Sequence, residues 1–333
     1  MSVRPADTSP LLPSPRGPVS AHLLDLLRGD PVGGLPEAAI TPDGAWGEDQ
    51  QLALYAGYEL HYQGFAGVDP ALEWDPSLLA LRARLERAFL TALQTATHPV
   101  PPLADVLSGL LAEPPDATGP SHHLLTDGER WQAREYLVHR SLYHLKEADP
   151  QMWVVPRLPH PAKAALVAVQ YDEYGAGRPE HAHALLFARM MSDFGLDPAY
   201  GRYLDLVPAP ALAVVNLMTL FGLHRALRAA LVGQFAAVEI TSPPGAERLA
   251  RAFERLGASA DGTLFYREHV VADAVHEQLV RYTVIEPLVA ADPHLADGIA
   301  FGITAAGLTE DRLARHLLDA WGAGRTSLHA AVL

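Results

Sequence analysis

Two histidines and an aspartate stand on one short segment, residues 269–276, with a spacing that would gather them on one side of a helix. His269, Asp273 and His276 are related as i, i+4 and i+7, so at about 100° per residue their side chains fall within about 60° of one another. The residues between them are valine and alanine, which suit a buried wall. Imidazole and carboxylate groups on a buried stripe are costly to desolvate, and a metal ion is the simplest compensating partner. The alternative is a helix whose polar stripe faces water and whose two histidines are incidental.

A second group of acids and histidines lies earlier in the chain, at residues 170–183. Glu173 and His183 are separated by two glycines and a proline, which predict a kink or a broken turn. On a straight helix these two side chains would lie about 80° apart, so the distortion can bring them together. Glu147 is a third acid, at the end of a predicted helix, and taken alone it is typical of surface charge or of a helix cap.

The composition limits the chemistry that these groups can support. The chain has 333 residues, of which 49% are hydrophobic, enough for one large domain or two ordinary ones. Its net charge of −14 argues against nucleic acid or an anionic membrane surface as a partner. The absence of cysteine excludes disulfides, thiolate zinc sites, iron–sulfur clusters and cysteine nucleophiles, so any metal must bind nitrogen and oxygen, which suits iron, manganese or zinc. No signal segment and no run of about 18 apolar residues is present, so we expect a soluble, cytoplasmic protein.

Helical patterns separated by proline-rich turns carry these residues. Apolar side chains recur at helical spacing in residues 50–63, 76–97, 127–146, 161–174, 180–194, 210–231, 235–240, 245–256, 265–289 and 308–321. No hairpin dipeptide joins alternating segments and no βαβ rhythm is present. We therefore predict an all-α bundle.

Prolines also suggest how the chain is divided. Residues 1–18 carry five prolines among serine and threonine, which predicts a disordered tail. The proline-interrupted stretch near residues 98–120 would separate a helical extension, residues 19–120, from a C-terminal bundle, residues 121–333, that carries both groups. The same stretch fits a long loop equally well.

Taken in order, these motifs make the chain similar to the heme-oxygenase-like diiron oxidases and oxygenases, also called iron-containing redox enzymes. The resemblance runs over roughly residues 130–320 and is carried by short motifs at residues 146–150, 170–177, 183–187, 216–218 and 268–276. It implies a heme-oxygenase-like helical bundle with an N-terminal helical extension, in which residues 121–333 form the diiron domain. Residues 1–120 lie outside the matched part.

The resemblance also implies a ligand set of three carboxylates and three histidines. Carried over residue by residue, the set is Glu147, Glu173, His183, His269, Asp273 and His276. The ten-residue step from Glu173 favours His183 over His181, and no ligand position is substituted. Two ferrous ions and three carboxylates would leave a net charge of about +1, which favours a reduced oxygen species. A mononuclear zinc or manganese site is the simpler alternative, but six ligands are more than it needs.

For the reaction, the resemblance implies two Fe(II) ions that bind O2, a peroxo-diferric intermediate, an external electron donor and a small-molecule substrate. Family members oxidise side-chain nitrogen of amino acids or arylamines, so our first hypothesis is N-oxygenation of a small amine or amino acid. Oxidative desaturation or C–C cleavage of an amino acid or fatty acid at the same site is the second. A non-catalytic helical binding protein is the third, and the intact ligand set argues against it. Heme ranks low, and no glycine-rich dinucleotide fingerprint is present.

Glu239 is the single acid in the apolar segment 236–240. It can be an extra ligand, a group that holds a ligand in place, or a contact for the cationic nitrogen of a substrate, and a satisfied core carboxylate is the structural alternative. We take it as the catalytic residue that meets the substrate nitrogen. The sequence does not set the oligomeric state, and a homodimer stays an open alternative to a monomer.

Overall fold

A computed structural model describes residues 9–31, 33–114 and 116–332, apart from the side chains of Glu37, Asp273 and Ala274. Every regular element in these ranges is helical, so the predicted all-α fold is confirmed. The α-helices are α1 (Pro18–Arg28), α2 (Glu48–Glu59), α3 (Pro76–Thr97), α4 (Leu103–Leu110), α5 (Pro120–Thr126), α6 (Arg130–His144), α7 (Asp149–Met152), α8 (His160–Glu173), α9 (His183–Asp193), α10 (Ala209–Leu223), α11 (Arg228–Arg255), α12 (Leu264–Gln278), α13 (Glu286–Ala291) and α14 (Leu295–Gly322).

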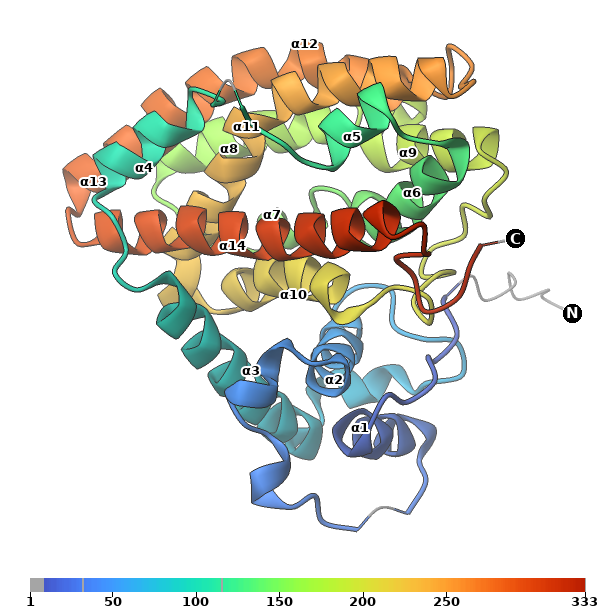
Figure 1. Cartoon of the computed structure of the whole chain (residues 1–333). Helices are drawn as coiled ribbons and strands as arrows, with labels where there is room; N and C mark the ends of the chain where they lie inside the picture. Colours follow the sequence, from blue (N-terminus) through green and yellow to red (C-terminus); the bar gives the residue numbers. More distant parts are fainter. Residues whose placement is uncertain (1–8, 32, 115, 333) are drawn as a thin grey trace, which may run out of the picture.

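The N-terminal helices α1, α2 and α3 pack together at one end of the molecule, drawn in blue and teal in Figure 1. The carboxylate of Asp75 caps α3 by accepting from the backbone N–H groups of Ser77 and Leu78. This part is fastened to the bundle through α10, where the buried Asn216 donates to the backbone and side-chain oxygens of Gln51 at 2.9 and 2.8 Å. The extension is thus packed against the bundle through buried contacts.

Residues 9–17 differ from the disordered tail predicted over residues 1–18. The guanidinium of Arg16 pairs with Glu48 at 2.7 Å and donates to the carbonyl of Leu204 at 2.7 Å. The backbone N–H of Ser14 donates to Asp205 at 2.8 Å. These contacts hold the proline-rich segment against the folded chain. Its composition alone could not predict them, because the partners lie far away in the sequence. Residues 1–8 lie outside the described part of the chain.

The long helices α11 and α14 pack against each other, with α10 in contact with both (Figure 1). Glycines on both helices allow their backbones to approach closely. A Cβ atom on Gly233 would lie 2.0 Å from the carbonyl oxygen of Ile299, and one on Gly302 would lie 2.0 Å from that of Ala230. A larger residue at either position would push the two helices apart, and the α11 side of the site would move with them.

Several predicted boundaries differ from the structure. The segment 210–231 is divided between α10 and α11, and the segment 308–321 is the later part of α14. The segments 235–240 and 245–256 belong to one helix, α11, which continues through Pro243 and Pro244. Proline lacks the N–H that a helix needs, so the carbonyls of Glu239 and Ile240 lose their usual helical donors. Packing of α11 against α5, α12 and α14 holds the helix together across this point.

The predicted helix 265–289 is divided into three parts. It runs as α12, then as a π-helix over Leu279–Ile285, then as α13. Turns of π-helix are rare and are frequently found near functional sites.

No single helix in the described ranges is both long enough and apolar enough to cross a lipid bilayer. The pair α10 and Arg225–Arg255 reaches that length and composition only when joined across a bend of 106°. Most of α10 is buried against other helices of the bundle.

Candidate metal centre

Glu173 and His183 face each other because one helix ends where the next begins. Glu173 is the last residue of α8 and His183 is the first residue of α9. The predicted kink between them is a tight loop in which Gly175 has a φ of 87° and a Cβ atom would lie 2.3 Å from the carbonyl oxygen of Arg178. Only glycine fits this position without strain. The loop brings Nδ1 of His183 to 2.6 Å from Oε2 of Glu173.

A first group of candidate ligands contains Glu147, Glu173, His183 and His269, whose nearest ligand atoms all lie within 4.8 Å of one another. All four side chains are buried. Nδ1 of His269 lies 2.7 Å from the carbonyl oxygen of Phe265, so we assign the proton to Nδ1. Nε2 then keeps its lone pair and lies 3.7 Å from Oε1 of Glu147. An imidazole fixed through one nitrogen in this way is typical of a metal ligand.

A second group contains Glu173, Glu239 and His276, again with ligand atoms within 4.8 Å of one another. Nδ1 of His276 lies 3.0 Å from Oε2 of Glu239 and 3.8 Å from Oε1 of Glu173. The Nε2 atom on the other side of the ring lies 3.2 Å from Asp172. Glu173 therefore belongs to both groups and directs a different oxygen to each: Oε2 towards His183 and Oε1 towards His276.

The donor set fits iron. Three carboxylates are buried together at Glu147, Glu173 and Glu239, and like charges at this separation repel strongly in a buried site. Oε2 of Glu147 is buried and has no hydrogen-bond partner within the described part of the chain. Oxygen and imidazole ligands without thiolate suit iron, manganese or zinc, and a carboxylate shared by two groups of ligands can hold two cations close together.

His144 supports the acid at the end of α6. Its Nδ1 atom lies 2.9 Å from Oε1 of Glu147. Burial opposes ionisation of Glu147, but the neighbouring imidazoles of His144 and His269 outweigh this effect and hold the pKa of Glu147 well below its ordinary value. Glu147 is thus a carboxylate ready to bind a cation. No pattern in the sequence singles out His144 beyond its position three residues before Glu147.

The structure brings together five of the six predicted ligands: Glu147, Glu173, His183, His269 and His276. The backbone of Asp273 lies in α12 between the two histidines, but its side chain is outside the described residues. Glu239 lies among the ligand atoms, which is one of the roles that its sequence position left open.

The expected burial of the whole segment 269–276 is wrong for its outer face. Val271 and Val275 are 72% and 60% exposed, whereas His276 is fully buried and His269 nearly so. The histidine stripe of α12 therefore faces the bundle while the opposite side of the helix faces outwards. Valines and alanines alone could not distinguish these two faces.

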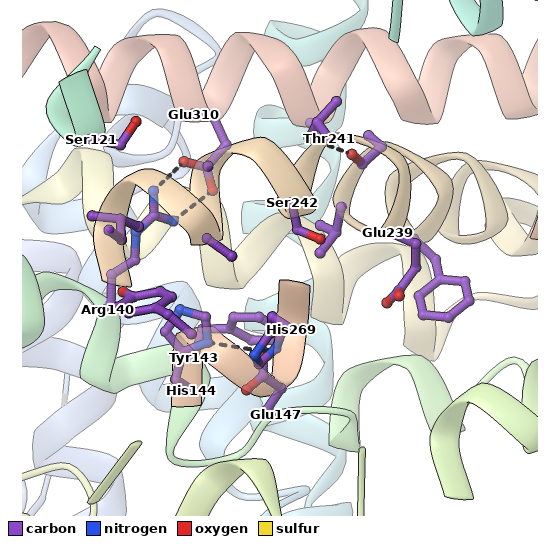
Figure 2. A pocket seen from close by; sticks show the side chains of 18 of the residues that line it. Ser121, Arg140, Tyr143, His144, Glu147, Glu239, Thr241, Ser242, His269 and Glu310 are labelled. Carbon is purple, nitrogen blue, oxygen red and sulfur yellow. Dashed lines mark hydrogen bonds and ion pairs between the residues drawn. The ribbon is translucent and has the colours of Figure 1, made fainter. Parts of the chain in front are cut away.

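A cavity of about 410 Å³ adjoins the two ligand groups (Figure 2). Its wall includes Glu147, Glu173, Glu239 and His269. Away from these residues, Arg140 and Glu310 form a bidentate ion pair across the cavity, at 2.8 and 2.7 Å. The cavity thus links the candidate metal centre to a polar end, and its size suits a small organic molecule.

Tyr143 lines the cavity beside the carboxylates. Its hydroxyl accepts a hydrogen bond from Nε2 of Gln151 at 3.3 Å. Burial, followed by the charges of Glu147, Glu173 and Glu239, raises the pKa of Tyr143 well above its ordinary value. The hydroxyl therefore keeps its proton at neutral pH and is available as a donor next to the centre.

Residues 134–310 match the model of a family described as iron-containing redox enzymes. The match covers more than half of the chain and spans all the candidate ligands, so the chain belongs to the iron-containing redox enzyme family. Its helical bundle is of the heme-oxygenase-like type, as the sequence predicted. No curated protein matches the sequence.

Proposed function

We propose that this protein is a non-heme diiron oxygenase that uses O2 to oxidise the nitrogen of a small amine or amino acid. The observation that carries the proposal is the shared carboxylate of Glu173, which directs one oxygen to each of two groups of buried ligands. One cation would be held by Glu147, His183 and His269, and a second by Glu239 and His276, with Asp273 added by the family resemblance. Two ferrous ions held there would supply the electrons and the Lewis acidity that O2 activation needs.

The surrounding residues hold the centre and its substrate. His144 donates to Glu147 and fixes the orientation of that carboxylate. Tyr143 keeps its hydroxyl proton and can donate a hydrogen bond into the cavity. In the overall reaction an amine, O2, two electrons from an external donor and two protons give a hydroxylamine and water. The N–H bond that breaks is replaced by N–OH, and the second oxygen atom leaves as water.

The charges around the cavity favour an amine over a fatty acid. Arg140 is the single arginine or lysine among the described residues that line the cavity, and Glu310 already neutralises it. Asp311 adds a further acid to the same wall. A carboxylate substrate would find no unpaired guanidinium or ammonium in this wall, whereas an amine would meet acids and neutral polar groups. This supports N-oxygenation over the desaturation or cleavage of a fatty acid.

The test begins with ferrous iron added under argon and measured per chain, with about two ions expected. The loaded protein is then mixed with ¹⁸O2, a chemical reductant and a panel of alkylamines, arylamines and amino acids with side-chain nitrogen, and products are identified by mass spectrometry. One ¹⁸O atom on nitrogen is the expected result. A protein that binds no iron would refute the proposal. Conversion of a fatty acid alone, without any amine product, would replace it by desaturation or cleavage.

A further inference from the structure

Gln170 carries a buried carboxamide. The residue is 2% exposed, and neither Oε1 nor Nε2 has a hydrogen-bond partner among the residues that the structure describes. Exchanging the two atoms would not change this, because both positions are open. Native proteins leave few buried polar groups unsatisfied, and each such group calls for an explanation.

Other buried amides of this chain show what a structural glutamine looks like. Gln51 is fully buried, and its Nε2 donates to the carbonyl of Ala45 at 2.6 Å. Its Oε1 accepts from Asn216 at 2.8 Å. Gln51 therefore joins two helices with both ends of its amide, whereas neither end of the Gln170 amide joins anything in the described structure.

The position of Gln170 points to a ligand. It lies three residues before Glu173 on α8, so the two side chains share one face of the helix at about 5–6 Å between Cβ atoms. Gln170 also lines the cavity that adjoins the candidate metal centre. The same cavity is lined by Gln151, whose Oε1 is buried without a partner while its Nε2 reaches Tyr143.

We propose that Gln170 forms a subsite for an uncharged group that offers both a hydrogen-bond donor and an acceptor, such as a primary amide or an un-ionised amine. An amide carries no charge, so it has no advantage for an ammonium or a carboxylate, which bind more strongly to groups of opposite charge. An alkyl group would leave both atoms of the amide unsatisfied. That the bound group belongs to the substrate rests on the proposed function. An un-ionised amine is also the form whose nitrogen lone pair can take an oxygen atom.

The test uses two probes of the same shape, benzamide and acetophenone, which differ by an NH2 group in place of a methyl group. Their dissociation constants are measured by calorimetry on the purified protein under argon, with and without ferrous iron. Wild type should bind benzamide about 5- to 10-fold more tightly, the effect of about one net hydrogen bond. In Gln170→Met the ratio should fall to about 1. Equal binding by wild type, or a preference retained in Gln170→Met, would overturn the subsite.

Thermal unfolding gives a second measurement that needs no ligand. Gln170→Met should keep or raise the melting temperature, because it removes an unsatisfied amide at similar volume. The matched control Gln51→Met should lower it by several degrees, since it leaves Asn216 without its side-chain acceptor. A fall in Gln170→Met as large as that of the control would show a structural amide and end the proposal.

The two proposals can fail separately. Neither the probe ratio nor the melting temperature requires turnover. A benzamide preference that depends on Gln170, with no amine oxidised by the iron-loaded protein, would keep the subsite and refute the oxygenase. Amine oxidation with a probe ratio unchanged in Gln170→Met would keep the oxygenase and refute the subsite.

Discussion

A buried ion pair joins the N-terminal helices to the segment that carries Glu147. Nζ of Lys146 lies 2.9 Å from Oε2 of Glu59, and the two side chains are 2% and 0% exposed. The hydroxyl of Tyr200 donates to both oxygens of Glu59, at 2.8 and 2.9 Å. The ammonium also lies 4.2 Å from the centre of the Tyr62 ring. Neither charge reaches water, so each depends on the other for compensation.

We expect Glu59→Gln to lower the free energy of unfolding by about 3 kcal/mol. Removing one partner of a buried pair costs about 3–5 kcal/mol, because the remaining charge stays buried without compensation. The ring of Tyr62 offsets part of this cost, since a cation–π contact contributes about 0.5–2 kcal/mol. The lower end of the range is therefore the expected value.

Urea unfolding followed by circular dichroism measures the effect, with an unchanged slope against urea showing that the denatured state is the same. Glu48→Gln is the matched control: its pair with Arg16 also joins distant parts of the chain at 2.7 Å, but Glu48 is 38% exposed. That variant should lose less than about 1 kcal/mol. The double variant Glu59→Leu with Lys146→Met should recover most of the loss. If Glu59→Gln loses no more than Glu48→Gln, the reasoning about burial is refuted.

Further predictions concern the ligands, the loop and the cavity. Glu239→Gln should reduce iron from about two ions per chain to about one; elemental analysis showing full iron content would remove this residue from the ligand set. Asp273→Ala should lower iron content and abolish O2-dependent turnover without unfolding the protein, and unchanged iron and turnover would contradict its role. Gly175→Ala should lower the iron content and the free energy of unfolding, because Gly175 has a φ of 87° and the new Cβ would lie 2.3 Å from a carbonyl oxygen. The control Gly195→Ala, with a φ of 71° and open space within 4 Å, should cost less, about 1–2 kcal/mol. Equal losses in urea unfolding would argue against the role of the loop. Burial opposes ionisation of Glu310, but its arginine partner outweighs this and holds the pKa of Glu310 below its ordinary value. Its stabilisation is therefore present above the unfolded pKa of about 4.3 and is lost as the pH falls through the lower folded value. The difference in melting temperature between wild type and Glu310→Gln should shrink below about pH 4, and a difference independent of pH would refute this assignment.

Local spacing was enough to predict the parts of the centre that lie on one element. The i, i+7 relation placed His269 and His276 on the inner stripe of α12, and the glycines after Glu173 indicated the break that brings His183 back towards it. Resemblance to a family then joined the separate segments. These signals are short in range, and each is determined by backbone geometry that nearby residues control.

Contacts between distant segments could not be predicted in this way. Glu239 was recognised as an unusual acid, but its place among the ligands depends on how α11 packs against α12. Pro243 and Pro244 predicted a helix end, because each proline removes a backbone hydrogen bond from a helix. The packing of α11 on both sides of the two prolines outweighs that loss. The pair of Glu59 and Lys146 joins positions 87 residues apart, so no periodic pattern reports it.

The two prolines of α11 also make the backbone that carries Glu239 easier to bend than the backbone that carries the other candidate ligands. Glu147 follows the end of α6 and bonds to His144, and Glu173 precedes a crowded loop at Gly175. Glu239 begins the one turn of α11 from which two helical hydrogen bonds are missing, so this is where the helix bends at the lowest cost. The carboxylate of Glu239 can therefore move when the charge or size of its bound partner changes, while the other candidate ligands stay in place. The bending of α11 at its prolines thus gives Glu239 more freedom to move than the other candidate ligands have.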